Sequence, residues 1–230
     1  MSLLLPKRLA AAGTPLIGRT GPCSILPGAV AVLPGRRRIY RTRGGASPWP
    51  SDDFNRANAD PLDGNWTARI NTWLLESNTA RRSSGPYAEA EHSVALPSGD
   101  ATISARILCK QFMAFYLYGR YVAGTGNCTG YSAIVSANGG TLGILVLAKW
   151  VPDYTVLGRY TFSEPAGDIP ESTMELVMNG SDLSLKWNGT TRVTVSDATY
   201  ANSRTGAAIG VYDNYTGESW LDTWQTGAVT

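Results

Sequence analysis

The chain has 230 residues, of which 43% are hydrophobic and 17% are charged, with a formal net charge of +2. This length allows one large domain or two small ones. The single histidine and the three cysteines, which form no C-x-x-C pair, argue against a zinc site and a disulfide framework. No apolar stretch is long enough to span a bilayer, so no membrane partner is predicted.

The charges are divided unevenly along the chain. Residues 1–50 contain eight basic residues and no acidic one, a formal charge of +8. The other 12 basic residues stand against all 18 acidic ones, a formal charge of −6. Residues 1–50 also hold seven of the 13 prolines, and each proline fixes φ and removes a backbone donor. We therefore predict an extended docking arm over residues 1–50 and one folded domain over residues 51–230.

The arm combines apolar runs with a dense basic cluster. Runs such as Leu3–Leu5 and Ala29–Leu33 lie between its prolines, and solvated linkers rarely carry so many aliphatic residues. Basic arms bind nucleic acid phosphates, but arginine also pairs with carboxylates on protein surfaces. Because arginines and aliphatic anchors are mixed, we favour docking to a protein; nucleic acid binding and a solvated tail are the alternatives. The predicted partner-binding residues are Arg36, Arg37, Arg38, Tyr40, Arg41 and Arg43.

The first residues do not resemble a secretory signal peptide. The apolar run Leu3–Leu5 is short, and the charges of Lys7 and Arg8 follow the run instead of preceding it. The odd number of cysteines agrees with reduced thiols. Synthesis in the cytoplasm is therefore predicted.

From residue 52 onward, short runs with strand composition recur between turn signals. Thr102–Ile107 and Asp182–Trp187 alternate apolar and polar residues, and a period of two predicts strands with one buried face. Asn179-Gly180 and Asn188-Gly189 suit tight hairpins because both positions tolerate positive φ. No segment has a sustained helical period, so residues 51–230 are predicted to form an all-β antiparallel jelly-roll β-sandwich. The clearest expected strands are Ala101–Lys110, Phe112–Arg120, Tyr131–Ala137, Leu142–Trp150, Met174–Met178, Leu183–Trp187, Arg192–Ser196 and Ala207–Tyr212.

Both ends of this region carry family-like motifs. Asp52–Ala57, followed by Pro61-Leu62 and Asn65–Thr67, is similar to the opening strand of concanavalin A-like, laminin-G-like jelly-roll domains. Gly206–Val211 and Leu221–Trp224 resemble the closing strands of these domains. The resemblance covers roughly residues 52–226 and implies that the first and last strands lie side by side in one sheet. Such domains occur in lectins, glycosidases, adhesion proteins and bacteriophage virion proteins.

The sequence contains no catalytic motif that we can identify. Jelly-roll glucanases carry their carboxylates on one strand, in the alternating acidic motif E-x-D-x(-x)-E. A resemblance to these enzymes would require the same motif in this sequence. Glu89-Ala90-Glu91 is the nearest match and lacks the central Asp. His92 stands between Glu91 and Ser93, but adjacent residues on a strand point to opposite faces, so these three side chains cannot form a catalytic triad. We expect His92 at the surface or as a cap. We therefore predict no enzyme activity and no catalytic residue.

Aromatic residues provide the candidate ligand contacts. Trp66 and Trp224 lie in the family-like end strands and are expected in the core, whereas Tyr116 and Tyr118 share one face of a strand. Exposed aromatic rings can stack on sugars. The predicted glycan-binding residues are Trp73, Trp150 and Tyr121.

Cofactor requirements are predicted to be absent, with calcium as the alternative. Asp52-Asp53 and Asp213-Asn214 could supply oxygen ligands, but there is no EF-hand loop. Asp and Asn are also expected in β-turns without any metal.

Two functions follow from these patterns. The basic arm and compact β-domain together look most like a phage virion protein, such as a capsid-decoration, head-fibre or tail component. Its partners would be capsid or tail subunits bound through residues 1–50, and many copies would be held in the virion. The alternative is a carbohydrate-binding adhesion module that recognises cell-surface glycans. Nucleic acid is a less favoured partner.

Overall fold

The computed structural model describes residues 47–110, 113–124, 129–137, 144–151, 153–162, 168–200, 202–213 and 219–230. These residues form fifteen strands and contain no helix, so within them no helix has the length and apolarity to cross a membrane. The strands are β1 (Ser51–Asp52), β2 (Trp66–Ile70), β3 (Trp73–Glu76), β4 (Thr79–Arg82), β5 (Tyr87–His92), β6 (Ala101–Cys109), β7 (Met113–Val122), β8 (Thr129–Ala137), β9 (Ile144–Val151), β10 (Asp153–Thr161), β11 (Ile169–Asn179), β12 (Asp182–Trp187), β13 (Thr190–Ser196), β14 (Gly206–Asp213) and β15 (Trp220–Gly227).

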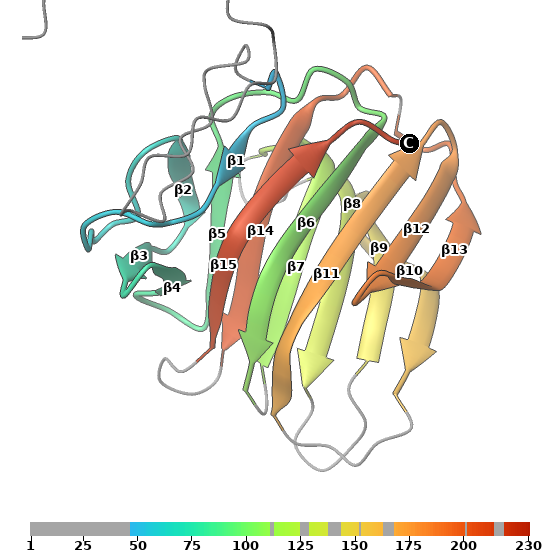
Figure 1. Cartoon of the computed structure of the whole chain (residues 1–230). Coiled ribbons are helices and arrows are strands. Elements are labelled where there is room, and N and C mark those ends of the chain that lie inside the picture. Colours follow the sequence, from blue (N-terminus) through green and yellow to red (C-terminus); the bar gives the residue numbers. More distant parts are fainter. Residues whose placement is uncertain are drawn as a thin grey trace, which may run out of the picture. The chain divides into compact units, whose positions relative to one another are not determined.

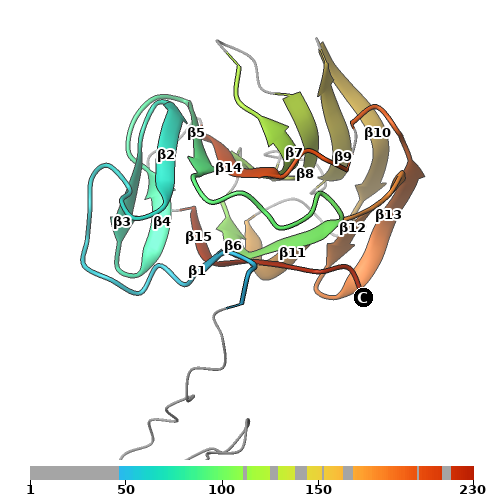
Figure 2. The ribbon, with the colours of Figure 1, turned by 90° about the horizontal axis from the view of Figure 1, so that it is seen from above.

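The strands build two antiparallel sheets that lie face to face (Figure 1). The seven-stranded sheet has the order β10-β9-β8-β7-β14-β5-β2. The eight-stranded sheet has the order β13-β12-β11-β6-β15-β4-β3, with β1 paired to β15. Figure 2 shows the two layers from above, with β14, β7 and β8 over β15, β6 and β11. The predicted all-β sandwich is therefore confirmed.

The eight clearest predicted strands correspond to β6–β9 and β11–β14. Alternation is regular in β6, where Ile103, Ala105 and Ile107 are buried and Ser104 and Arg106 between them face outward. Both predicted hairpins form, with positive φ at Gly180 (56°), Asn188 (48°) and Gly189 (76°). The first turns at Gly180-Ser181 and not at Asn179-Gly180, because Asn179 pairs with Asp182. Strand β10 was not predicted, because Gly158 interrupts its apolar run and weakens the strand signal.

The first and last strands are adjacent, as the family resemblance implied. Ser51 pairs with Gln225 and Asp52 pairs with Trp224. The Asp52 carboxylate accepts hydrogen bonds from the Phe54 amide at 2.7 Å and from the Trp66 indole at 2.8 Å. The pairing of β1 with β15 holds the first strand of the sandwich against the last one, and the bonds of Asp52 hold the following segment in place.

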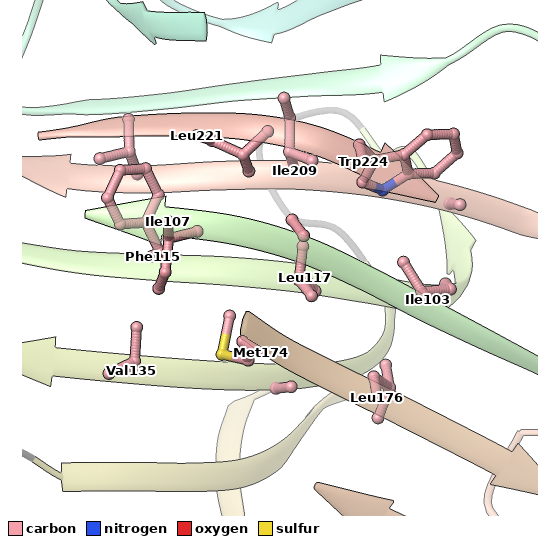
Figure 3. Packing of buried hydrophobic residues seen from close by; sticks show 14 of the residues in the cluster. Ile103, Ile107, Phe115, Leu117, Val135, Met174, Leu176, Ile209, Leu221 and Trp224 are labelled. Carbon is pink, nitrogen blue, oxygen red and sulfur yellow. The ribbon is translucent and has the colours of Figure 1, made fainter. Parts of the chain in front are cut away.

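Aliphatic and aromatic side chains from both sheets fill the space between them (Figure 3). Phe115 and Leu117 from β7 meet Ile103 and Ile107 from β6 and Leu176 from β11, and all five are fully buried. Burying one such side chain contributes about 1.5–3 kcal/mol relative to leaving it exposed. This core gives each sheet one buried face and leaves the other face outward.

His92 lies in this core, so the expectation that it is at the surface is wrong. Only 4% of it is exposed, and its ring centroid lies 5.0 Å from that of Trp66 and 4.8 Å from that of Trp224. The reason is the alternation of β5, in which Ala88, Ala90 and His92 point inward. Trp66 and Trp224 are buried in the core, as predicted.

The six predicted partner-binding residues of the arm, from Arg36 to Arg43, lie outside the described residues. The arm and its boundary at residue 50 therefore stay predictions. Within the described part, Trp49 packs against the core, and the Thr226 hydroxyl donates a hydrogen bond to the Pro50 carbonyl at 2.6 Å. The last residues assigned to the arm thus contact the sandwich.

Candidate functional site

The outer face of the seven-stranded sheet carries aromatic side chains where a solvated face would carry polar ones. In β7, Phe115 and Leu117 point into the core, so the alternating residues Tyr116 and Tyr118 point outward. Neighbouring strands in register with β7 add further rings. We call this surface the tyrosine face, and it consists of Tyr87, Tyr116, Tyr118, Tyr121, Trp150, Tyr154 and Tyr212.

The rings of the tyrosine face contact one another across the sheet. Tyr116 and Tyr118 stack with their centroids 5.8 Å apart and their planes 5° apart. Tyr87 meets the edge of Tyr116 at 5.8 Å. On the other side, Trp150 lies 6.5 Å from Tyr118 and 4.9 Å from Tyr154. The aromatic contacts therefore run without interruption from β5 to β10.

Gly210 at the centre of β14 makes room for this packing. A Cβ atom at Gly210 would lie 3.0 Å from Cε2 of Tyr118 and 3.3 Å from the Tyr87 hydroxyl. Both distances are shorter than ordinary van der Waals contact. The tyrosine side chains therefore lie directly over the backbone of β14.

A β-bulge at Arg120 adds Tyr121 to the face. Strict alternation from Tyr118 would turn Tyr121 into the core, but Arg120 has a φ of 47° and the register shifts beyond Gly119. The Tyr121 ring consequently lies 5.7 Å from that of Tyr118. Bulges commonly redirect one side chain in this way.

Arg120 is 1% exposed and anchors the bulge. Its guanidinium donates to the carbonyls of Gly99 (3.1 Å), Tyr200 (2.9 Å) and Gly180 (2.7 Å), and to the Asp100 carboxylate (2.9 Å). These acceptors belong to separate connections of the sandwich. One buried arginine thus holds three connections and the end of β7 together.

The rings differ in how far a ligand could reach them. Tyr118 and Tyr121 are buried, whereas Tyr87, Tyr116 and Trp150 are half-buried. Tyr154 and Tyr212 are 44% and 39% exposed. The buried rings therefore support the platform, and the others form its accessible surface.

A buried carboxylate lies among the tyrosine hydroxyls. Glu89 is 2% exposed and faces outward from β5, between the inward-facing Ala88 and Ala90. The Tyr87 hydroxyl donates to Glu89 at 2.6 Å, and the Tyr121 hydroxyl donates to its other oxygen. The Tyr87 and Tyr118 hydroxyl oxygens are 2.7 Å apart. Three phenols and one carboxylate thus form a single hydrogen-bonded cluster.

Two phenols of the face, those of Tyr116 and Tyr154, resist ionisation. Burial raises the pKa of Tyr116 to about 12, with smaller contributions from Tyr154 and Tyr212. Burial also raises the pKa of Tyr154, although the nearby charge of Arg159 opposes this shift. The hydroxyl groups of Tyr116 and Tyr154 therefore stay neutral at neutral pH.

The structure places two of the three predicted glycan-binding residues on this face. Trp150 is half-buried, with its indole nitrogen 3.0 Å from the Ser132 hydroxyl, and Tyr121 lies beneath the surface. The expectation that Trp73 is exposed is wrong. Trp73 is 1% exposed because it shares the inward side of β3 with Leu75 in the other sheet. The expectation of exposure is also wrong for Tyr121, which is 2% exposed because the bulge packs its ring against Tyr118. The roles of Trp150 and Tyr121 in binding stay predictions.

Sequence reasoning missed several members of the site. Period-two alternation on the last predicted strand would have placed Tyr212 on the same side as Gly210, opposite the apolar Ile209. The same pattern on β5 would have separated Tyr87 and Glu89 from the inward alanines. Tyr154 was missed together with β10.

The remaining acidic candidates are already engaged. Glu91 accepts from two nitrogens of Arg69, one of them at 2.7 Å. Both oxygens of Asp52 accept hydrogen bonds from the protein. Among the described residues, no three His, Cys, Asp or Glu side chains are grouped to hold a metal. The Asp213 side chain and Asn214 lie outside the described part, so the calcium site stays a prediction.

Comparisons with known proteins identify the fold. No protein-family model and no curated protein matches the sequence. Among solved structures, the carbohydrate binding module CBM66 from Bacillus subtilis is similar with a TM-score of 0.52 and 16% identity over 72% of this chain and 94% of that chain. The Emp46p carbohydrate recognition domain in its potassium-bound form is similar with a TM-score of 0.54 and 11% identity, over 72% of this chain and 90% of the other.

LamAcat from Zobellia galactanivorans is also similar, with a TM-score of 0.51 and 10% identity over 76% of this chain and 95% of that chain. At these identities the likeness establishes the fold alone. The sandwich has the jelly-roll fold that the sequence predicted.

Proposed function

We propose that the chain is a carbohydrate-binding module whose ligand lies across the tyrosine face. The observation that carries this proposal is the continuous band of contacting rings on the outer side of the sheet, contributed by β5, β7, β9 and β10. This side does not contribute to the core between the sheets, so its aromatic character is not required by the sandwich. Contiguous apolar surface on a folded domain commonly marks an interaction site.

The accessible rings suit a saccharide in particular. A sugar ring presents an apolar face of C–H groups and a rim of hydroxyls, and tyrosine and tryptophan likewise combine an apolar ring with a polar tip. Trp150 and Tyr154 lie at one side of the face and Tyr212 at the other. A chain of several sugars could therefore contact both sides at once. Ligand sites commonly combine such apolar lining with a few polar groups.

The similar structures support binding more than catalysis, by analogy of fold alone. Two of them are described as a carbohydrate binding module and a carbohydrate recognition domain. Another is described as a transglycosylase, so the fold by itself does not decide between the two. The outward carboxylates of β5 favour binding, because Glu89 is covered by tyrosines and Glu91 is paired with Arg69. Glycoside hydrolysis needs two carboxylates that can reach the scissile bond.

Titration of the full chain with a panel of neutral oligosaccharides tests this function. Tyr154→Ala removes the most exposed ring, and we expect it to weaken binding by about tenfold, which corresponds to about 1.4 kcal/mol. Trp220→Ala is the matched control, because Trp220 lies in the other sheet and packs against Arg106. Absence of binding to every glycan in the panel, or equal losses in both variants, would show that the proposal is wrong.

Virion assembly remains a proposal that rests on the basic charge and the apolar runs of residues 1–50, because none of the similar structures supports it. Replacing the six predicted arm residues by alanine in the full chain should abolish assembly with a larger particle if this role is correct. Sedimentation of this variant beside the unchanged chain measures the effect. Identical behaviour would remove the reason for assigning a docking role to the arm.

A further inference from the structure

Arg159 is an exposed cation on β10, the edge strand of the seven-stranded sheet. Its side chain forms no hydrogen bond and no ion pair with any residue that the structure describes. By contrast, Arg69 on the other edge strand of the same sheet is paired with Glu91. The guanidinium of Arg159 therefore keeps its N–H donors available to a ligand.

A β-bulge in β10 turns Arg159 toward the tyrosine face. Val156 points outward and is 42% exposed. Strict alternation from Val156 would turn residue 159 inward, but the register shifts between Val156 and Gly158. Leu157 packs against the core, and a Cβ atom at Gly158 would lie 2.5 Å from the core residue Val193. Both residues thus face inward, and Arg159 takes the next outward position.

Arg159 lies beside accessible rings of the tyrosine face. It pairs with Val146, a member of the outer apolar cluster that packs against Tyr116. Its charge opposes the rise in the pKa of Tyr154, so the guanidinium lies close enough to act on the Tyr154 hydroxyl. The Tyr154 ring in turn lies 4.9 Å from that of Trp150. A sugar that contacts these two rings therefore has a cation near its rim of hydroxyls.

The surface next to Arg159 favours an ionic contact. Ile134, Val146 and Ala148 form the adjacent apolar cluster and are 5%, 7% and 0% exposed. Electrostatic attraction beside such a surface is stronger than in open water, because the local dielectric constant is lower. The guanidinium presents a planar fork of donors that suits the oxygens of a carboxylate or a sulfate.

The carboxylates of this face do not oppose an anion at Arg159. Glu91 is neutralised by its pairing with Arg69. Glu89 and Arg159 stand at the two ends of one row that crosses six strands in register. Five steps of about 4.8 Å separate them by about 24 Å along the sheet. The screening length at physiological ionic strength is only about 8 Å.

We infer that the tyrosine face selects acidic glycans, and that Arg159 binds their anionic group, a carboxylate or a sulfate. The inference rests on the proposed function and adds the class of ligand. The rings contact the apolar faces of the sugars, and one charge-assisted contact provides the preference for acidic over neutral chains.

A matched series of β-1,4-linked hexamers tests the inference by calorimetry on the full chain at low salt. Glucose, glucuronic acid and glucose 6-sulfate hexamers differ only at C6, which is a hydroxymethyl group, a carboxylate or a sulfated hydroxymethyl group. We expect an acidic hexamer to bind about fivefold more tightly than the neutral one, the upper range for an exposed ion pair. The tighter of the two acidic hexamers identifies the anion. Galactose and galacturonic acid hexamers with α-1,4 linkages repeat the comparison in a second geometry.

Two variants assign the preference to one side chain. Arg159→Gln should reduce the preference for the acidic hexamer to less than about twofold. Arg106→Gln is the matched control, because it removes the same charge from an exposed side chain on the other sheet. The preference should be unchanged in Arg106→Gln.

Several outcomes would overturn the inference. Equal binding of neutral and acidic hexamers would do so while leaving the proposed function intact, and so would binding of a neutral glycan from the panel when no hexamer binds. A preference that persists in Arg159→Gln, or that falls equally in Arg106→Gln, would assign it to other groups or to net charge. If Arg159→Gln does not fold, the unchanged chain provides the test. Its preference must decline as the salt concentration rises, and a preference independent of salt contradicts a role for Arg159.

Discussion

The two outer faces of the sandwich differ sharply, although the same kind of strand builds both. On the eight-stranded sheet, β6 presents Thr102 and Ser104, and neighbouring β11 and β12 present Glu175 and Lys186. Charges there are paired, as in the 2.9 Å contact between Lys186 and Glu175. On the seven-stranded sheet the equivalent positions hold tyrosine, alanine and glycine.

The difference between the two outer faces shows which residues the sandwich fold requires and which it does not. Both sheets contribute apolar inner faces to one core, and a polar outer face is sufficient for the eight-stranded sheet. The tyrosine face therefore reflects a requirement other than the stability of the sandwich. Its buried members, Tyr118 and Tyr121, hold the exposed rings in place, and Arg120 holds Tyr121.

The largest expected effect comes from removing the anchor of the bulge. Arg120→Met removes a buried cation and leaves carbonyl groups without their donor, which should lower the free energy of unfolding by about 3–5 kcal/mol. For a chain of this size that corresponds to a decrease in Tm of about 6–20 °C. Thermal unfolding followed by circular dichroism measures this change.

Arg106→Met is the matched control on the eight-stranded sheet. Arg106 bonds two carboxylates, those of Glu171 and Asp222, but 45% of its side chain is exposed. Exposed ion pairs contribute about 0–1 kcal/mol, so its Tm should change little. Equal decreases in Tm in the two variants would mean that burial does not determine how much each arginine contributes to stability.

Some of these structural features can be predicted from the sequence, and others cannot. The alternation of β6 and the Asn188-Gly189 turn are local patterns, and both predicted the structure correctly. Neither Arg120 nor its neighbours signal a positive φ, because arginine has no preference for that conformation. The place of Tyr121 on the tyrosine face depends on that one backbone angle.

Only part of the candidate site was predictable from the sequence, because the sequence does not tell which side of a strand faces the other sheet. Trp150 was identified from its aromatic character, but Trp73 has the same character and lies in the core. Alternation tells which residues of a strand share a side, not which side faces the other sheet. That choice depends on long-range pairing, as it does for His92 on β5.

A second substitution alters the tyrosine face while leaving its rings unchanged. Gly210→Val would place methyl groups against Tyr118, whose ring atom lies 3.0 Å from the position of the first added carbon. Overpacking of this kind costs about 1–3 kcal/mol, and tilting of the rings should also weaken glycan binding. Gly227→Val is the control on β15, where only the Thr102 hydroxyl lies near the added carbon. Near-ultraviolet circular dichroism should change in the first variant and not in the second.

The inward side of β5 gives a smaller, pH-dependent effect. Burial lowers the pKa of His92 below its ordinary value of about 6.5, although the Val94 carbonyl and the charge of Asp52 oppose the shift. The unfolded chain therefore takes up the proton more readily than the folded one. The contribution of His92 to the free energy of unfolding should therefore be fully present above about pH 6.5 and should decline as the pH falls below this value.

His92→Phe keeps an aromatic ring between the tryptophans and should remove this decline between about pH 7 and pH 5. Because His92 is the single histidine of the chain, no other imidazole can mask the change. Denaturant titrations at several pH values provide the measurement. A decline of the same size in His92→Phe would assign it to other groups.

The smallest effect is expected on the polar outer face. Lys186 and Glu175 form an ion pair with side chains that are 33% and 25% exposed, and such pairs contribute about 0–1 kcal/mol. A double-mutant cycle with Lys186→Ala and Glu175→Ala should therefore give a coupling energy within that range, measured by denaturant unfolding. Neither variant should alter glycan affinity, because both residues lie on the sheet opposite the tyrosine face. A loss of affinity in Lys186→Ala would show that ligand binding is not confined to the seven-stranded sheet, and the functional contrast between the faces would no longer hold.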